Sequence, residues 1–551
     1  MRMLLLSVAA AATLTVPDQY ATLASACTSA ATGDEIVVSA YALEDIYCDV
    51  SGKELTIRGA TSGVKVDPIY ASDGSVWLED VVIASQGGGG SIVANPSAVI
   101  ANRVSLTYEG AHGIVLTDGS TLDSEQGLVI NGIGGTSVGL LVTASGTQET
   151  RVSVTGGRFS SNRNSAVVLV GGGELLDFTC TDCTFAGNGW GYPANGGGID
   201  TSGAAVSLTL GGGAFTDNIS TATGGAVNTT GDLTLTGVTF SGNSSGDGSA
   251  VWHKSGSLDV TSTSFLDNRA HGLSGGALIS TEPQSFSVHA STFTGNQTSA
   301  AVPGTSALVG KDLPGGATVQ WSRFCDNGPS FAPTSEFAST VALTGSGNLV
   351  FIRNVVDQNK GLDQAAGVVL GGAGVKNVEH NTFAGNDDRR ATLAIGAGTL
   401  RFVNNFVDSN AAGLVLAAGA TVEAENNAFR EQDNPGDNGN FDITNPDYLD
   451  YAVGGGCEVY PYIGDGSELI NRGSENTIAG YIDDQGLPDV GAAYVDGELP
   501  EDTDDPTDTD TDTDAVVDSG PAFVPGGSTG GCSHSPAAGL LGLLLLVRRR
   551  R

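Results

Sequence analysis

One short phrase recurs through the middle of this chain and limits its fold more than any other feature. A large apolar residue is followed three positions later by Asn, and the copies start 22 to 32 residues apart if Phe429, which lacks the Asn, is included. The copies are Phe159–Asn162, Phe185–Asn188, Phe215–Asn218, Phe240–Asn243, Phe265–Asn268, Phe293–Asn296, Phe324–Asn327 and Phe383–Asn386, with Val356–Asn359 and Val407–Asn410 as Val versions. A repeat of this length predicts a solenoid in which each copy belongs to one coil.

The segments between the phrases have the pattern of short strands. Each interval holds two or three alternating segments, such as AVNTT, DLTLTGVTF and SLDVTSTSF, separated by Gly, Ser, Asn and Asp. No window shows sustained helical periodicity, and 81 of the 551 residues are Gly. Strands of this length with polar breaks fit a parallel β-helix with about 27 residues per coil.

Stacked coils give the recurring phrase a physical meaning. Successive strands in a sheet lie about 4.8 Å apart, so equivalent residues stack directly on one another. We expect the Phe side chains to form an apolar column inside the coils. We expect each Asn to stand at a bend in the left-handed conformation, where its amide bonds the turn backbone or the next Asn.

A second signature accompanies the first. Paired Gly followed by Ala and an aliphatic residue occurs at Gly224–Val227 and Gly275–Leu278, and Gly196–Ile199 is a variant. Paired Gly suits a corner with unusual backbone angles. The alternation of GGA[VIL] and FxxN over roughly residues 150–430 resembles the repeats of polymorphic outer membrane proteins.

The start of the body resembles another family. The stretch LTVPDQYATLASACTSAATGDEIVVS resembles the opening of pectin-lyase-like right-handed β-helices, which implies a cap helix at about Tyr20–Ala31 and a strand at Ile36–Ser39. Asp489–Tyr494 resembles the phrase that closes such proteins. We therefore expect an all-β body over residues 13–495, a single-stranded right-handed parallel β-helix with an N-terminal cap helix.

The N-terminus is typical of an export signal. Residues 1–12 contain Arg2, a short apolar run and small residues, which predicts a signal peptide cut near Ala10 or Ala12. The alternative is a first buried strand.

The C-terminus reads as a linker and a sorting tail. Residues 496–530 carry acids at nearly every second position from Asp502 to Asp514, which predicts a disordered linker. Residues 531–551 contain Cys532, a short apolar helix at Ala537–Val547 and four terminal Arg.

This tail resembles the MYXO-CTERM sorting signal. The resemblance implies that Cys532 is the processing or lipid-attachment residue, and that sorting machinery displays the chain on the outer membrane of a Gram-negative, myxobacterium-like bacterium. A simple membrane anchor is the alternative and leads to the same compartment.

The other cysteines suggest disulfides, because their number is even and the predicted signal peptide implies export. They are Cys27, Cys48, Cys180, Cys183, Cys325 and Cys457. Cys27 with Cys48 would hold the cap, Cys180 with Cys183 would close locally, and Cys325 with Cys457 follows only by elimination. No second CxxC or His at ligand spacing supports a metal site. We expect no cofactor, with calcium binding as the alternative.

The chain is strongly acidic. It has 61 Asp and Glu against 24 Lys and Arg, a formal charge of −37. Phosphate binding needs basic side chains, so a nucleic-acid partner is excluded.

Catalysis by a β-helix of the pectin-lyase type would need acids and bases that converge from neighbouring coils. The best cluster is Glu379, His380, Asp387, Asp388, Arg389 and Arg390. The motif set of that family does not appear in order, and charges that are merely solvated in a loop are the alternative interpretation.

Asp217, Asp267 and Asp326 share one position with Gly187, Gly242, Gly295 and Gly385, which indicates turn chemistry. His112, His253, His271 and His289 have no acid at fixed spacing.

These observations predict a monomeric, surface-displayed protein that is not an enzyme. Its expected role is adhesion, or binding of a glycan or surface protein along the long face. Trp190, Trp252 and Trp321 are candidate contact residues, with corner packing as the alternative. A polysaccharide lyase or glycoside hydrolase that uses the Glu379–Arg390 cluster, and a structural spacer in the envelope, are the alternative functions.

Overall fold

The computed structural model describes residues 11–444 except 41, 45, 85–89, 108–111, 136, 192, 194, 204, 273, 299–303, 330–338, 361–365, 387–390, 409–413, 417–418 and 431–438; beyond 444 it describes 457, 467–469, 472–473 and 490. Residues 1–10 of the predicted signal peptide (residues 1–12), the predicted acidic linker and the tail with Cys532 lie outside the described residues.

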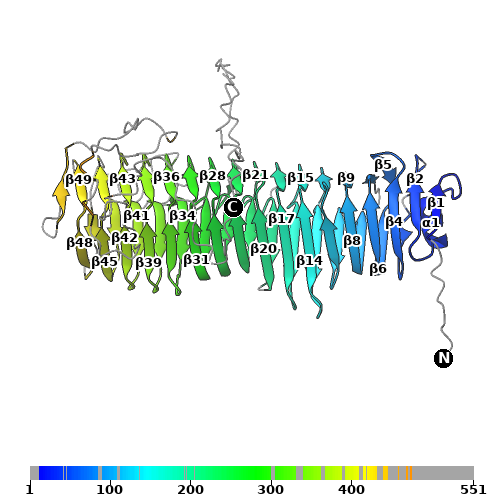
Figure 1. Ribbon diagram of the computed structural model, residues 1–551, viewed down its shortest axis with the longest axis horizontal. Helices are drawn as coiled ribbons and strands as arrows, with labels where there is room; N and C mark the ends of the chain where they lie inside the picture. The colour runs from blue at the N-terminus through cyan, green and yellow to red at the C-terminus, as the bar shows by residue number, and fades with distance from the viewer. Residues whose placement is uncertain are drawn as a thin grey trace, which may run out of the picture. The chain divides into compact units, whose positions relative to one another are not determined.

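The described chain is an all-β solenoid of stacked coils with parallel strand pairing (Figure 1). Each regular coil contributes one strand to each of three rows. The first row contains β10 (Ile114–Thr117), β13 (Leu140–Ala144), β16 (Val167–Gly171), β19 (Ile199–Ser202), β22 (Val227–Thr229), β26 (Val251–His253), β30 (Leu278–Thr281), β34 (Thr305–Lys311), β38 (Ser339–Thr344), β41 (Ala366–Gly371), β44 (Ala391–Ile395) and β47 (Leu414–Leu416).

The second row follows the first in each coil. It contains β1 (Thr13–Val16), β2 (Glu35–Val38), β4 (Glu54–Gly59), β11 (Thr121–Ser124), β14 (Thr150–Thr155), β17 (Leu176–Thr181), β20 (Val206–Gly211), β23 (Asp232–Thr236), β27 (Gly256–Thr261), β31 (Pro283–His289), β35 (Ala317–Gln320), β39 (Leu349–Ile352), β42 (Lys376–Glu379), β45 (Thr399–Val403) and β48 (Thr421–Glu425). The long strands β6 (Ile69–Glu79) and β8 (Ile92–Asn102) run through both rows, and β3 (Cys48–Asp49) pairs with β6, so these strands form one 30-stranded sheet.

The third row is a separate 16-stranded sheet that carries the FxxN phrase. It contains β5 (Val64–Val66), β7 (Val81–Ile83), β9 (Ser105–Thr107), β12 (Val129–Asn131), β15 (Arg158–Ser160), β18 (Thr184–Ala186), β21 (Ala214–Thr216), β24 (Thr239–Ser241), β28 (Ser264–Leu266), β32 (Thr292–Thr294), β36 (Arg323–Cys325), β40 (Val355–Asp357), β43 (Thr382–Ala384), β46 (Phe406–Asp408), β49 (Ala428–Arg430) and β50 (Phe441–Asp442). A small fourth row contains β25 (Ser244–Ser245), β29 (Arg269–Ala270), β33 (Gln297–Thr298) and β37 (Gly328–Pro329).

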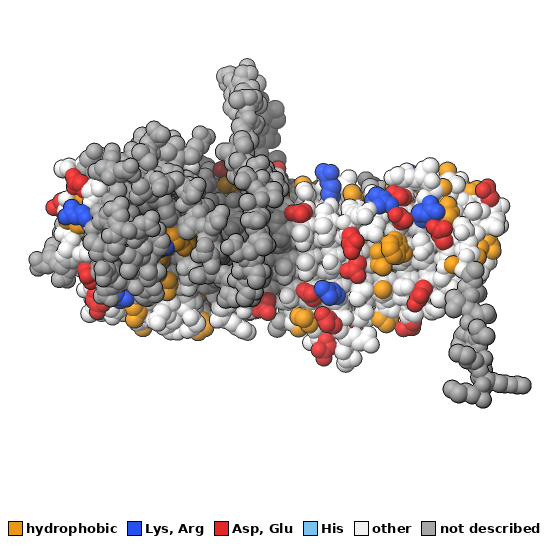
Figure 2. All heavy atoms as spheres, in the orientation of Figure 1, with side chains coloured by type: hydrophobic (Ala, Val, Ile, Leu, Met, Phe, Trp, Pro, Cys, Tyr) orange, Lys and Arg blue, Asp and Glu red, His pale blue; other side chains and the backbone are white. Residues whose placement is uncertain are grey.

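Alternation along each strand separates the core from the surface. In β17, Leu176, Phe178 and Cys180 point inward and are buried, whereas the residues between them face solvent. On the face of the N-terminal half that Figure 2 shows, hydrophobic side chains form small separate patches among charged and neutral polar ones.

The N-terminal cap is close to the expectation. The helix α1 runs over Leu23–Ser29, shorter than the predicted Tyr20–Ala31, because Thr22 and Ser25 form a capping box that starts it. Leu23, Ala26 and Cys27 are buried, and Cys27 forms a disulfide with Cys48. The predicted strand at Ile36–Ser39 is β2, one residue earlier. The helix covers the first coil, which would otherwise expose strand edges.

The Phe side chains form a continuous internal column. The rings from Phe159 to Phe324 stack pairwise, with centroids 4.4 to 5.1 Å apart. In the coils before Phe159, the same register position holds Leu106 and Ile130, so the column continues there with aliphatic residues. Stacked ring pairs add about 0.5–1.5 kcal/mol each to the hydrophobic burial.

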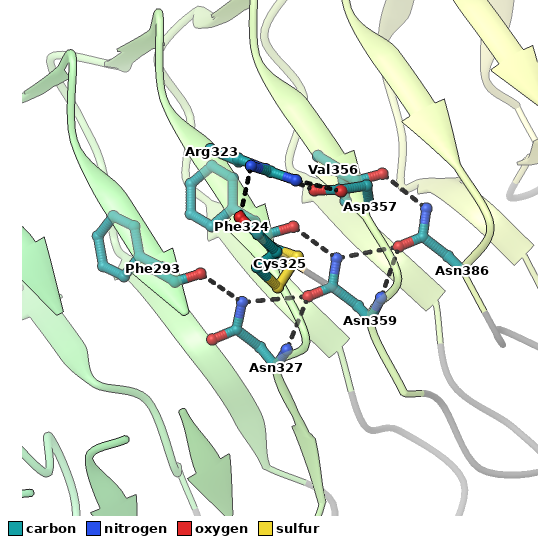
Figure 3. A network of polar contacts seen from close by, with 10 residues as sticks. Phe293, Arg323, Phe324, Cys325, Asn327, Val356, Asp357, Asn359 and Asn386 are labelled. Carbon is teal, nitrogen blue, oxygen red and sulfur yellow. Dashed lines mark hydrogen bonds and ion pairs between the residues drawn. A yellow bond between two sulfur atoms is a disulfide. The ribbon is translucent and has the colours of Figure 1, made fainter. Parts of the chain in front are cut away.

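The repeated Asn forms a buried ladder from Asn162 to Asn386, but the predicted left-handed conformation is wrong for it. The positive φ belongs to the preceding residue, such as Asp217 at 53° and Gly242 at 65°. From Asn162 to Asn359, each Nδ2 donates to the Oδ1 of the next Asn and to the carbonyl of the apolar third-row residue in the previous coil, as Asn359 does to Asn386 (2.9 Å) and Phe324 (2.8 Å) (Figure 3). The side-chain amide thus replaces strand pairing where the chain turns away from the sheet.

A second Asn ladder lies at the corner before the third row, and the sequence analysis missed it. Asn354, Asn381, Asn405, Asn427 and Asn440 bond one another by Nδ2 to Oδ1 contacts of 2.9 to 3.2 Å. The signal was present as Asn two residues before the third-row Phe or Val.

The disulfides of the structure join the suggested pairs, Cys180 with Cys183 and Cys325 with Cys457 in addition to the cap. Cys325 faces outward from β36, so Cys457 lies against the outside of the third row. Further along the same row, Phe406 and Ala428 form an external apolar cluster with Ile443, Leu469 and Val490. Cys457, Leu469 and Val490, which follow β50 in the sequence, therefore lie against the outside of the third row.

Candidate functional site

The first two residues of the predicted catalytic cluster serve a coil corner. Glu379 ends β42 and is fully buried, with its carboxylate 3.7 Å from Arg401. His380 follows in the left-handed conformation, with φ at 53°, and is also buried. Its Nε2 lies 3.2 Å from the amide of Asn404, the left-handed residue of the same corner in the next coil.

The rest of that cluster, Asp387, Asp388, Arg389 and Arg390, lies outside the described residues. Arg401, which pairs with Glu379, also lies 3.7 Å from the carboxylate of Glu423. A proton-transfer pair needs hydrogen-bond reach to a substrate, and these two side chains are buried.

The three equally placed Asp residues also serve corners. Asp217, Asp267 and Asp326 have φ values of 52° to 53° and lie immediately before an Asn of the ladder. The carboxylates of Asp217 and Asp267 extend over Gly242 and Gly295, the equivalent residues of the next coil. Asp326 forms an ion pair with Lys360. The alternation of Asp and Gly is turn chemistry, as the sequence suggested.

The described histidines lie in separate places. His253 is fully buried, with Nδ1 2.8 Å from Ser280 Oγ and Nε2 2.9 Å from the Gly231 carbonyl, and burial lowers its pKa to about 4. His112 accepts a hydrogen bond from the Val138 N–H, and burial lowers the pKa of His112. His271 lies beside Ser244, and its pKa is also lowered by burial. No group of three His, Cys, Asp or Glu residues able to hold a metal ion occurs among the described residues.

Two buried charged features were missed by the sequence analysis. Arg323 and Asp357, from neighbouring third-row strands, form a buried ion pair at 2.7 Å, and Arg323 Nη1 donates to the Cys457 carbonyl at 2.9 Å (Figure 3). Lys376 occupies an inward position of β42, between Leu349 and Leu400, and its amine donates to the carbonyls of Gly372, Gly374 and Ala397. Burial lowers the pKa of Lys376. The Arg323 guanidinium thus joins β36 to β40 and to Cys457, and the Lys376 amine joins β42 to the turns that contain Gly372, Gly374 and Ala397.

The tryptophans differ in how the fold uses them. Trp190 is 51% exposed, but its Nε1 donates to Ser161 and the Arg163 guanidinium lies 5.3 Å from its ring centroid. Trp321 is a left-handed corner residue with Arg353 4.4 Å from its ring centroid. Trp252 faces outward from β26 between Asn228 and Ile279 and is partly buried.

The fourth tryptophan was not singled out from the sequence. Trp77 lies on the outward face of β6 and is 46% exposed. The outward direction of its side chain follows from the strand register of the first coils. The sequence did not predict this register, because the FxxN phrase is absent there.

No protein-family model, curated protein or solved structure matches the chain. Within the described residues, none of the helical structure has the length and apolar character required to cross a bilayer.

Proposed function

We propose that this protein is a noncatalytic binding scaffold, exported and displayed on the cell surface, where it mediates adhesion by binding a glycan or a surface protein. One observation carries this proposal. The described acids and histidine that the sequence analysis considered for catalysis lie at corners of the coils. They are Glu379, His380, Asp217, Asp267 and Asp326. A solenoid whose ionisable groups serve its corners is suited to present a long surface.

The display part of the proposal rests on the sequence. The N-terminal signal, the acidic linker and the tail with Cys532 are the features that support it, together with three disulfides in the body, since disulfides persist in oxidising compartments. In this proposal sorting machinery processes the tail near Cys532 and leaves the chain on the outer membrane. Pectin-lyase-like and polymorphic outer membrane protein ancestry remains part of the proposal and is supported by the quoted motifs alone.

The test compares catalysis with binding. Purified full chain is incubated with pectate, alginate and chondroitin, with calcium and with chelator, and products are measured by size and by absorbance of unsaturated ends. The proposal expects no cleavage, and beads coated with the protein should adhere to cells or matrix of the host bacterium. Cleavage that disappears in Asp387→Asn with Asp388→Asn would overturn it in favour of a lyase or hydrolase. Absence of both cleavage and adhesion would favour an envelope spacer.

A further inference from the structure

Trp77 is an exposed aromatic side chain to which no hydrogen bond or cation contact among the described residues assigns a structural role. It occupies an outward position of the second row, where the later coils carry Asp123, Ser153 and Thr179 in register. Neither its ring nor its indole N–H contacts a hydrogen-bonding or cationic partner among the described residues. Buried or structural Trp residues normally bond their N–H.

Trp190 provides the contrast within the same chain. It is similarly exposed, yet its N–H bonds Ser161 and Arg163 lies over its ring. These contacts account for Trp190 as part of the corner. Trp77 lacks both, so its exposed surface is available to a ligand.

The residues around Trp77 form a flat platform with a polar rim. Thr56 and Ile100 are its register partners on the neighbouring strands, and strand spacing places them about 4.8 Å away on either side. Ser75 and Glu79 lie two positions away along β6, on the same face, at about 6.6 Å by the rise of a strand. Ile100 extends the apolar surface, whereas the other three surround it with hydroxyl and carboxylate groups.

The charged part of the rim is held in place. Arg58 lies beside Glu79 in register, and its Nε is 2.9 Å from Glu35. Glu79 also pairs with Arg103, which bonds Asp80 at 2.7 Å. The hydroxyls of Thr56 and Ser75 make no hydrogen bond to another described residue. A rigid sheet with fixed ion pairs presents these groups without an ordering cost on binding.

This chemistry matches one class of ligand. A pyranose ring has an apolar face of C–H groups and a rim of hydroxyls, so it can cover an indole while its edge bonds Thr, Ser and Glu side chains. The excess of 61 acids over 24 bases disfavours polyanionic chains. We propose that Trp77, with Ile100 and the polar groups around them, binds neutral glycans on the second-row face. This inference rests on the proposed binding function and gives it a site and a ligand class.

The test uses the full chain and compares Trp77→Ala with the matched variant Trp190→Ala. Probes are cellulose and chitin in pull-down, and soluble xyloglucan and laminarin in affinity electrophoresis and tryptophan fluorescence titration. The wild-type chain should bind at least one neutral probe, Trp77→Ala should weaken that binding at least tenfold, and Trp190→Ala should change it less than twofold. Trp77→Phe should retain part of the affinity, since a ring remains, and far-ultraviolet circular dichroism checks that each variant keeps its sheet.

The inference is overturned if no neutral probe binds the wild-type chain, if pectate or alginate binds in preference, or if Trp77→Ala binds as well as wild type. Any of these results leaves adhesion through another surface intact, because bead adhesion is scored separately. Loss of bead adhesion with retained glycan binding would instead contradict the proposed function alone.

Discussion

The carboxylate of Asp217 occupies the space in which a Cβ atom on Gly242, one coil further along, would lie. Both residues have positive φ and hold the same corner of successive coils. Asp267 has the same relation to Gly295, and Asp182 to Gly212 at the corner before the third row. At these three places the Asp carboxylate leaves no room for a Cβ in the next coil, whereas Asp326 is followed by Gln358 at the equivalent position.

This relationship predicts unequal costs for two similar substitutions. Gly187 and Gly242 share the corner position and have φ values of 60° and 65°, but a Cβ on Gly187 meets nothing within 4 Å. Gly187→Ala should lower the free energy of unfolding by about 1–2 kcal/mol, because Ala must adopt the left-handed backbone conformation. Gly242→Ala should lose about 1–3 kcal/mol more, because the Asp217 side chain must move. Urea unfolding measures both, and adding Asp217→Ser to Gly242→Ala should recover the difference. Equal losses for the two Gly variants would show that the Asp217 carboxylate moves aside without an energetic cost.

The Asn ladder predicts a large loss from one amide. Asn243 Nδ2 donates to Phe215 and Asn268, and its Oδ1 accepts from Asn218, all fully inside the corner. Asn243→Ala leaves several buried groups without partners, each costing about 1–3 kcal/mol, so we expect a loss of at least about 3 kcal/mol in urea unfolding. The control Asn164→Ala removes a partly exposed amide that bonds Gly135 and Ser137 and should cost about 1 kcal/mol or less. Similar midpoints for the two variants would contradict the role of the ladder.

Burial of His253 predicts an acid-sensitive term in stability. Its folded pKa of about 4 lies below the unfolded value, so between pH 6.5 and 4 the unfolded chain binds a proton that the folded protein excludes. Stability is therefore lost as pH falls through this window, by at most about 3 kcal/mol. The measurement is the free energy of unfolding at pH 7 and pH 4.5 for wild type and His253→Gln. The variant should lose less stability on acidification than wild type, and an identical pH dependence would refute the assignment.

The ion pair beneath the returning chain predicts strong coupling. Arg323 and Asp357 are 4% and 0% exposed. Arg323→Met removes the cation that pairs with a buried carboxylate and should lower the free energy of unfolding by about 3–5 kcal/mol, whereas adding Asp357→Leu should restore much of the loss. Arg151→Met, which removes a 63%-exposed partner of Asp177 at 3.9 Å, should change stability by less than about 0.5 kcal/mol. Additive effects of Arg323→Met and Asp357→Leu in the double-mutant cycle would contradict a coupled pair.

Local patterns made the coil predictable. The spacing of Phe159, Phe185 and Phe215 gave the period and the internal column, because a residue that recurs once per coil meets its own equivalent. The conformation of the corner was assigned to the wrong residue, since Asn and its predecessor both tolerate turns and only backbone angles separate them. The corner position of His380, whose φ is 53°, was likewise not recognised from the sequence.

The repeat, the cap and the all-β character follow from sequence alone, because each depends on contacts between residues that recur at a nearly constant interval. The outer surface was decided by the tertiary structure. Arg323 is buried because Cys457, 132 residues beyond its neighbour Cys325, returns to cover it. Trp77 is exposed because the register of β4, β6 and β8 turns it outward with no chain described over it. Which outward residues stay exposed depends on distant segments and strand register, and a one-dimensional period contains neither.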